Sequence, residues 1–279
     1  MNIIESIKQR RSIRTYTGEP LNAAHKAQIQ EFINQLKAPF GVKARIEMLS
    51  IQPDKEPVKL GTYGWIKGAV DYLALVFEEA LFAETAAAYM FEQVVLFCTS
   101  LGLGTCWLGG SFSRKDFKKQ LSLKPNESLR IVSPVGYPND KKRLFEKIVV
   151  NAEHNHSTRK HFSTLFFHNQ FDKPLTQTTA GVYYLPLEMV RLAPSANNKQ
   201  EWRAVLQDEQ TIHFYKKTYI NFDSIDIGIA LCHFELTCRE LGIEGKYVHL
   251  EDFPKTDLFQ YVISWKGQDS PAETLHPLQ

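Results

Sequence analysis

The segment Cys98-Thr99-Ser100-Leu101-Gly102-Leu103 returns 140 positions later as Cys238-Arg239-Glu240-Leu241-Gly242-Ile243. Each copy closes a long apolar stretch, and a glycine after the last periodic residue is typical of a helix end. Further along, residues 132–136 match residues 263–267 in the same order, with serine and glycine at equivalent places. A period this long excludes a solenoid. The sequence therefore predicts two copies of one α+β unit, with chance similarity between short apolar patterns as the alternative.

Hydrophobic periodicity places the same kinds of element in both parts of the chain. Helices are predicted over residues 2–9, 21–36, 81–101, 113–120, 186–192 and 224–241, and strands over residues 45–51, 70–77, 129–135, 202–207, 211–215, 246–250 and 259–265. We expect an α+β fold, in which a mixed, mostly antiparallel sheet is flanked by helices and two tandem halves pack as a pseudo-dimer. The boundary falls in the polar connector 151–160, so half 1 is residues 1–155 and half 2 is residues 156–279.

Composition and charge argue against several classes of partner. The chain carries 33 basic and 31 acidic side chains, and a formal charge of +2 gives no general reason to expect nucleic acid or an anionic membrane. The most apolar stretch is interrupted by Glu84 and Glu92, so no membrane span is expected. The charged N-terminus lacks a signal-peptide pattern. Four cysteines without a C-x-x-C pair predict reduced thiols in a cytoplasmic protein.

A polar loop follows the predicted helix 186–192. Pro194 stops that helix, and small and amide-bearing residues run from Ser195 to Gln200. Small residues let a flat ligand approach the backbone, and amide side chains can bond to the ligand's polar edge. The alternative is an ordinary surface loop, which composition alone favours.

The two halves differ in their polar residues, although their patterns match. Half 1 has the basic segment 10–14, the glycine-rich loop 102–110 and the basic cluster 141–143. Half 2 has the polar loop 195–200, where half 1 has only residues 40–42. One complete site can therefore be assembled where the halves meet, and the other site lacks its polar groups.

Three of these segments together resemble motifs of the FMN-dependent nitroreductase superfamily. They are Arg10-Arg11-Ser12-Ile13-Arg14 after a short helix, residues 102–110 after a long helix, and residues 193–202 with Ala193-Pro194-Ser195-Ala196. The resemblance covers most of the chain. The chain is similar to an internally duplicated version of the family, in which one polypeptide takes the place of the usual homodimer.

The resemblance implies a role for each basic residue. Arg10, with Lys141 or Arg143, would hold the FMN phosphate, because a buried dianion needs charge-assisted hydrogen bonds. Arg14, with Lys67, would face the pyrimidine edge of the flavin, where negative charge grows on reduction. The full set of implied cofactor-binding residues is Arg10, Arg11, Ser12, Arg14, Lys67, Trp107, Leu108, Gly109, Gly110, Lys141, Arg143, Pro194, Ser195, Ala196, Asn198 and Gln200. No catalytic side chain is expected, since the cofactor carries the chemistry.

The resemblance also implies the reaction. NADH or NADPH would reduce FMN, and a small-molecule electron acceptor, such as a nitroaromatic or a quinone, would be reduced next by a ping-pong mechanism. One chain would bind one FMN and act as a monomeric pseudo-dimer. The alternatives are a non-catalytic FMN-binding protein for storage or sensing, and a protein that keeps the fold but whose site no longer functions.

Two other patterns suggest ligand sites that the surrounding sequence does not support. Gly102, Gly104 and Gly109 suggest a dinucleotide loop, but they follow a helix rather than a strand. Histidines at positions 154, 156, 161 and 168 fit no standard ligand spacing, so no metal site is expected.

Overall fold

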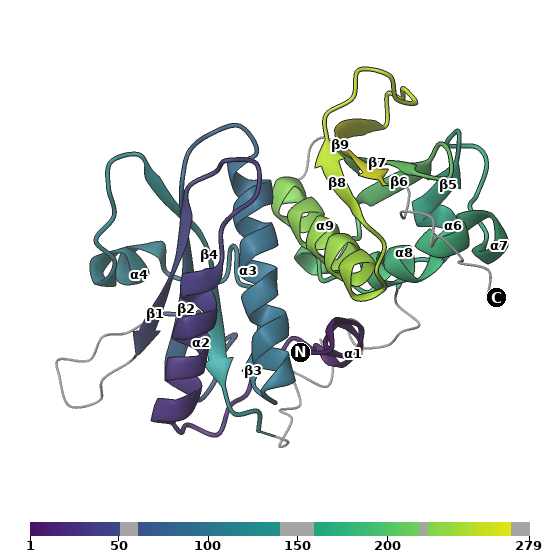
Figure 1. Cartoon of the computed structure of the whole chain (residues 1–279). Helices are drawn as coiled ribbons and strands as arrows, with labels where there is room; N and C mark the ends of the chain where they lie inside the picture. Colours follow the sequence, from purple (N-terminus) through teal and green to yellow (C-terminus); the bar gives the residue numbers. More distant parts are fainter. Residues whose placement is uncertain (51–60, 140–158, 218–221, 269–279) are drawn as a thin grey trace, which may run out of the picture.

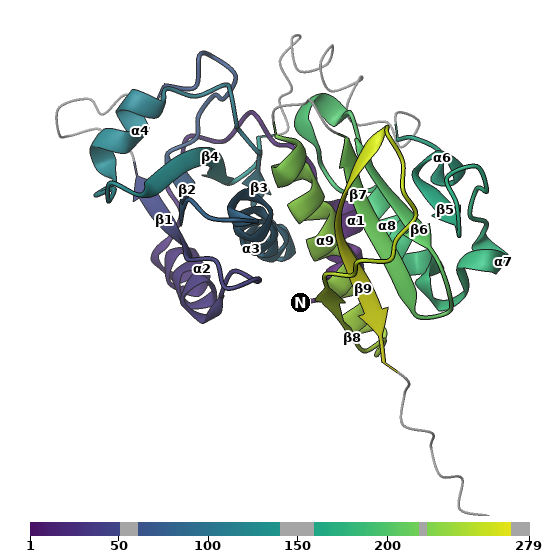
Figure 2. The same cartoon turned by 90° about the horizontal axis from the view of Figure 1, so that it is seen from above.

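The computed structural model describes residues 1–50, 61–139, 159–217 and 222–268. The chain forms two β-sheets, and the long helices lie between them (Figure 1). Seen from above, the layers follow the order sheet, helices, helices, sheet, and the short helix α4 (Arg114–Gln120) covers the outer side of the first sheet (Figure 2). The prediction of an α+β fold with mostly antiparallel sheets flanked by helices is confirmed. In the described residues no helix is long and apolar enough to cross a membrane.

The two sheets have the same strand order apart from one added strand. Sheet 1 has the order β1-β2-β4-β3 and is antiparallel throughout. Its strands are β1 (Ala44–Ser50), β2 (Asp71–Glu78), β3 (Gly104–Thr105) and β4 (Glu127–Gly136). Sheet 2 consists of β5 (Phe166–His168), β6 (Trp202–Leu206), β7 (Thr211–Lys217), β8 (Gly245–Val248) and β9 (Phe259–Gly267). Its order is β5-β6-β7-β9-β8, so without β5, which pairs in parallel with β6, the arrangement of sheet 1 is repeated.

Periodicity located the main elements closely. The other described α-helices are α1 (Ile3–Gln9), α2 (Ala23–Gln35), α3 (Ala83–Ser100), α6 (Phe162–Leu165), α7 (Gln177–Ala180), α8 (Tyr184–Arg191) and α9 (Asp223–Glu240). Every predicted helix and strand is present, with ends that differ from the prediction by at most two residues. The sequence missed β3, α6, β5 and α7, because elements of two to four residues are too short to show a repeat. Most of the predicted connector 151–160 lies outside the described residues.

Helices α3 and α9 form the centre of the molecule and have closely similar ends. Each is preceded by a phenylalanine in the left-handed conformation, Phe82 with φ 62° and Phe222 with φ 77°. Each is followed by a glycine with positive φ, Gly102 at 74° and Gly242 at 71°. In both, the N–H group after the glycine donates to the carbonyl five residues back, which is the Schellman arrangement. The repeated sequence therefore produces a repeated local structure.

The two central helices approach each other closely at Gly228 of α9. A Cβ atom placed on Gly228 would lie 2.2 Å from the carbonyl oxygen of Thr85 and 3.0 Å from the Cβ of Ala88, both in α3. Glycine is therefore required here by packing rather than by backbone conformation, since its φ is not positive. Buried side chains of both halves belong to one apolar core around this contact.

We predict that Gly228→Ala lowers the free energy of unfolding by about 1–3 kcal/mol, because the added methyl group overpacks the contact between α3 and α9. The same substitution in an exposed helix would stabilise by about 1 kcal/mol, so the sign of the effect is diagnostic. Urea denaturation followed by circular dichroism measures it. A stabilised Gly228→Ala variant would contradict the close approach.

Candidate functional site

Helix α1 belongs to half 1 and packs on helices of both halves. It contacts α3, α8 and α9, and the carboxylate of Glu240, at the end of α9, accepts hydrogen bonds from the backbone N–H groups of Ile3 and Ile4. A carboxylate is favourable there, because the first N–H groups of a helix have no partner within the helix. The docked helix ends at Arg10, which is only 6% exposed.

The segment after α1 lies beside two parts of half 1 that the sequence predicted to share a site. Ser12 pairs with Thr105 of β3, and the backbone N–H of Lys67 donates to the carbonyl of Arg14 at 2.9 Å. The structure thus brings Arg14 and Lys67 together through their backbones. The Arg14 side chain is 9% exposed, whereas Lys67 is exposed to solvent.

Gly104 permits this close approach. A Cβ atom on Gly104 would lie 2.8 Å from the side chain of Ile13, so the segment 10–14 could not reach β3 with a larger residue there. The basic segment and the strand that leads into the glycine-rich loop therefore lie side by side.

The loop 106–110 continues from β3 and meets half 2. Leu108 exchanges two backbone hydrogen bonds with Val132 of β4, at 2.9 and 3.1 Å. A Cβ atom on Gly109 would lie 2.6 Å from the ring of Phe222, whereas one on Gly110 would meet no atom within 4 Å. The backbone N–H and C=O groups of Leu108 therefore both bond to β4. Any N–H group offered to a ligand by this loop must come from a neighbour such as Gly109 or Gly110.

The polar loop of half 2 has an unusual backbone. Asn197, Asn198 and Gln200 have positive φ angles of 51°, 55° and 51°. Asparagine tolerates this conformation, but a glutamine in it is uncommon. The Oγ of Ser195 accepts a hydrogen bond from the N–H of Gln200 at 2.9 Å, and the Gln200 amide donates to the carbonyl of Asn198 at 2.9 Å. Such backbone outliers cluster at ligand-binding sites, which favours the binding interpretation over an ordinary loop.

The glycine-rich loop and the polar loop converge on the first turn of α9. Gly109 abuts Phe222, the residue before this helix, and the N–H of Ala196 donates to both carboxylate oxygens of Asp226 at 3.0 and 3.1 Å. Residues 222 and 226 are one helical turn apart. Motifs from opposite halves of the chain are therefore brought to one place.

Several predicted residues have defined local partners. The guanidinium of Arg11 is exposed and donates to the carbonyls of Lys8 and Arg10, which closes the end of α1. Gln200 is 1% exposed, and its Oε1 accepts from the N–H of Lys160 at 2.8 Å. Lys141 and Arg143 lie outside the described residues.

Half 2 uses its own basic segment to support the polar loop. The guanidinium of Arg159 donates to the carbonyl of Ala193 at 2.5 Å, and Lys160 is bonded to Gln200 through both its N–H and its Nζ. Burial lowers the pKa of Lys160, and the nearby carboxylate of Glu201 opposes that shift. In the repeat, Arg159-Lys160-His161 is the worn counterpart of Arg10-Arg11-Ser12. This counterpart therefore contacts the loop that completes the predicted site.

Buried polar residues that the sequence did not single out lie beneath the glycine-rich loop. Glu92 of α3 accepts a hydrogen bond from the Trp107 indole at 2.8 Å and lies 2.9 Å from His233 of α9. One signal was available, because Glu92 interrupts the most apolar stretch of the chain. Nothing in the sequence marked His233 or Asp226, whose partners are distant in the chain.

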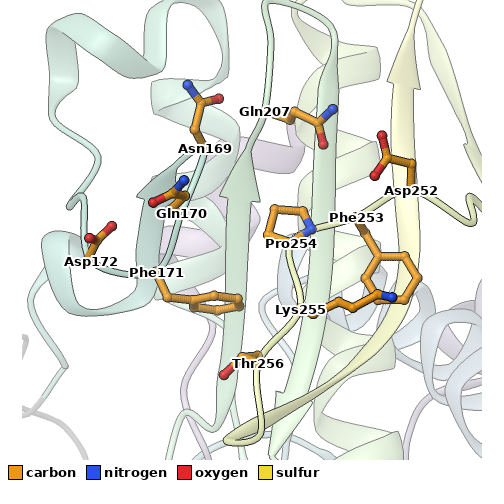
Figure 3. A pocket seen from close by; sticks show the side chains of 10 residues that line it. All are labelled: Asn169, Gln170, Phe171, Asp172, Gln207, Asp252, Phe253, Pro254, Lys255 and Thr256. Atoms are coloured by element: carbon orange, nitrogen blue, oxygen red, sulfur yellow. The ribbon is translucent and has the colours of Figure 1, made fainter.

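The described chain also contains a hollow away from these motifs. A cavity of about 610 Å³ lies between the segment 169–172 and the segment 252–256 of half 2, and Gln207 also lines it (Figure 3). Its charged side chains are exposed, and none of its residues belongs to the predicted cofactor set. No group of three or more His, Cys, Asp or Glu residues in the described regions could hold a metal ion.

Comparison with known proteins decides the family. The model of the family described as "Putative TM nitroreductase" matches residues 2–238. The chain belongs to this family. A Thermotoga maritima MSB8 protein described in the same terms has a similar solved structure, with a TM-score of 0.60 and 20% sequence identity over 95% of this chain and 94% of that chain.

Other nitroreductase structures match about half of the chain. A Bacteroides fragilis NCTC 9343 nitroreductase with bound FMN covers 52% of this chain and 92% of its own, at 19% identity and a TM-score of 0.41. A Desulfovibrio desulfuricans nitroreductase in complex with FMN covers 53% and 95%, at 21% identity and a TM-score of 0.40. Among curated proteins, none matches the chain. Membership of the nitroreductase family indicates an oxidoreductase.

The contact between Gly109 and Phe222 can be tested in this nitroreductase-family chain. We predict that Gly109→Ala lowers the free energy of unfolding by about 1–3 kcal/mol, because the methyl group would collide with the ring. The cost should largely disappear in a Phe222→Ala background, as a double-mutant cycle would measure. Gly110→Ala is the matched control and should change stability by less than about 0.5 kcal/mol. Equal costs for the two alanines would rule out the contact.

Proposed function

We propose that the chain is an FMN-dependent oxidoreductase that takes hydride from NADH or NADPH and reduces nitroaromatic, quinone or similar electron-poor acceptors. The observation that carries the proposal is the convergence at α9. The basic segment 10–14 and the glycine-rich loop of half 1 adjoin each other, and that loop meets the same helix end as the polar loop of half 2.

The residues present fit FMN chemically. Two guanidinium groups, those of Arg10 and Arg14, are more than nine-tenths buried, which suits a phosphate dianion and the electron-rich edge of a flavin. Glycine at position 110 leaves open space where a side chain would otherwise project, so a flat ring can approach the backbone. Family members with bound FMN support the choice of cofactor.

We assign the residues as follows. Arg10 and Ser12 would bind the phosphate and the ribityl chain, and Arg14 with Lys67 would stabilise negative charge at the pyrimidine edge. The N–H groups of Gly109 and Gly110 would face the redox-active edge, since those of Leu108 belong to the sheet. Pro194, Ser195, Ala196 and Asn198 would cover the ring from half 2. Arg11 and Gln200 would shape the site from behind, because their side chains already bond to the protein.

Bound FMN would supply the chemistry, accepting hydride from the nicotinamide and passing electrons to the acceptor in a second, ping-pong half-reaction. The protein would orient both substrates in turn and place positive charge where negative charge develops. No side chain is assigned as an acid or base.

We also propose that the chain arose by duplication and packs as a single-chain pseudo-dimer with one FMN. An offset of 140 relates Ala88 to Gly228, and these two positions face each other where α3 meets α9. Contact between equivalent positions is expected on a twofold axis. The repeated strand order of the two sheets supports the same conclusion. The second site would bind no FMN, since residues 40–42 offer no polar side chain.

We predict that the purified protein carries a flavin absorbance band, at one FMN per chain. Arg10→Ala should weaken FMN binding about 10- to 100-fold, because a hydrogen bond to a charged group contributes roughly 1.5–3 kcal/mol. Lys8→Ala is the matched control, since it removes a nearby, exposed positive charge outside the predicted cofactor set. Fluorescence titration with FMN measures both. A colourless protein that cannot be reconstituted would exclude flavin function.

Mixing the FMN-loaded protein with NADH or NADPH without oxygen should bleach the flavin band, and a nitroaromatic or a quinone should restore it. Stopped-flow absorbance follows both half-reactions. A protein that binds FMN but keeps its colour with both nucleotides would instead be a storage or sensing protein. In that case the enzyme assignment falls and the binding site stands.

A further inference from the structure

A chain of buried polar groups crosses from half 1 to half 2 beneath the glycine-rich loop. The indole Nε1 of Trp107 donates to Glu92 Oε2 at 2.8 Å, and Glu92 Oε1 lies 2.9 Å from His233 Nε2. The other ring nitrogen of His233 lies 2.9 Å from the carbonyl oxygen of Met189 in α8. Glu92 and His233 are both 0% exposed. The chain therefore links the loop at the proposed site to the helix that precedes the polar loop.

Hydrogen-bond roles fix the number of protons in this chain. A carbonyl can only accept, so His233 Nδ1 carries a proton for Met189, and the Trp107 indole can only donate. One further proton must lie between Glu92 Oε1 and His233 Nε2, either on the imidazole or on the carboxyl group. Both arrangements give a pair with no net charge and with every buried polar atom satisfied. Such a network holds its members in one geometry, because removing one member leaves a buried group unbonded.

The chain of bonds exists on only one side of the repeated structure. The offset of 140 between the two central helices places Cys232 where Glu92 would be repeated. In the sheets, Thr105 pairs with Val135 as Lys246 pairs with Lys266, which places Val248 where Trp107 would be repeated. A thiol cannot accept two strong hydrogen bonds, and burial raises the pKa of Cys232, which keeps it uncharged. Valine has no side-chain donor that could take the place of the Trp107 indole. A network needed only to join the halves would have no reason to favour the side of the complete site.

We propose that Glu92 and His233 are positioning residues, which hold Trp107 and the glycine-rich loop in the geometry that binds FMN. The ligand part of this proposal rests on the proposed function, whereas the positioning of Trp107 does not. Glu92 acts through Trp107 on one side and through His233 and Met189 on the other. The two loops that form the site are thereby held at one separation.

Glu92→Leu should weaken FMN binding at least 10-fold, and Glu92→Gln should change it by less than about 3-fold. Glutamine can accept from the Trp107 indole and donate to His233 Nε2, while Nδ1 still donates to Met189. Tyr89→Phe is the matched control, because Tyr89 of α3 donates to Glu235 of α9 at 2.8 Å without touching the glycine-rich loop. Fluorescence titration with FMN gives the affinities, and urea denaturation corrects for lost stability.

A second measurement needs no cofactor. The indole N–H signal of Trp107 in a ¹⁵N NMR spectrum, assigned with Trp107→Phe, should exchange slowly in the native protein and in Glu92→Gln and quickly in Glu92→Leu. If Glu92→Leu does not fold, Glu92→Met serves in its place. Unchanged exchange in the leucine variant would overturn the positioning role, as would equal losses of FMN affinity in Glu92→Leu and Tyr89→Phe. If the native protein binds no FMN but the exchange pattern holds, only the proposed function fails.

Discussion

The packing of α9 against α3 is the constraint on which the rest of the molecule depends. The two helices touch at Gly228, where no side chain fits, and one apolar core surrounds the contact. Once α9 is fixed there, its two ends position everything else. Its last residue, Glu240, holds the start of α1, and its first turn meets the glycine-rich loop at Phe222 and the polar loop at Asp226. A single helix thus sets the relative positions of the three motifs.

This arrangement places the strained part of the structure where rigid parts support it. The polar loop contains three non-glycine residues with positive φ, and such conformations persist only when neighbours hold them. Here the neighbours are Asp226, which binds the N–H of Ala196, and Lys160, whose N–H binds Gln200. Polar side chains that are predicted from sequence to bind a ligand therefore divide into two kinds. Arg11 and Lys67 are exposed to solvent, whereas Gln200 is buried and shapes the backbone of the loop.

The sequence predicted the fold well because its signals are local and repeated. Helices α3 and α9 show long apolar stretches that end in leucine and glycine, and periodicity sets their limits within two residues. Arg14 and Lys67, which the resemblance assigns to one edge of the flavin, are hydrogen-bonded through their backbones, and their roles at the flavin stay a prediction. The buried residues that support the candidate site could not be predicted in the same way. His233 is one polar residue in an apolar helix, and its bonds to Glu92 and Met189 join segments far apart in the chain. Only the folded structure reveals such partners.

The differences between the halves suggest how a duplicated unit changes when one site is enough. In half 1 the segment 10–14 buries two arginines beside β3, as a phosphate site requires. In half 2 the equivalent segment retains Arg159 and Lys160, but their hydrogen bonds go to Ala193 and Gln200 of the polar loop. In the single-FMN arrangement that we propose, this positive charge supports the polar loop instead of holding a second cofactor. The difference between glutamate at position 92 and cysteine at position 232 fits the same proposal, because a buried carboxylate is costly unless it is fully bonded. Under the proposed duplication, each half would keep the polar groups that one shared site uses, and the other copies of those positions could become apolar.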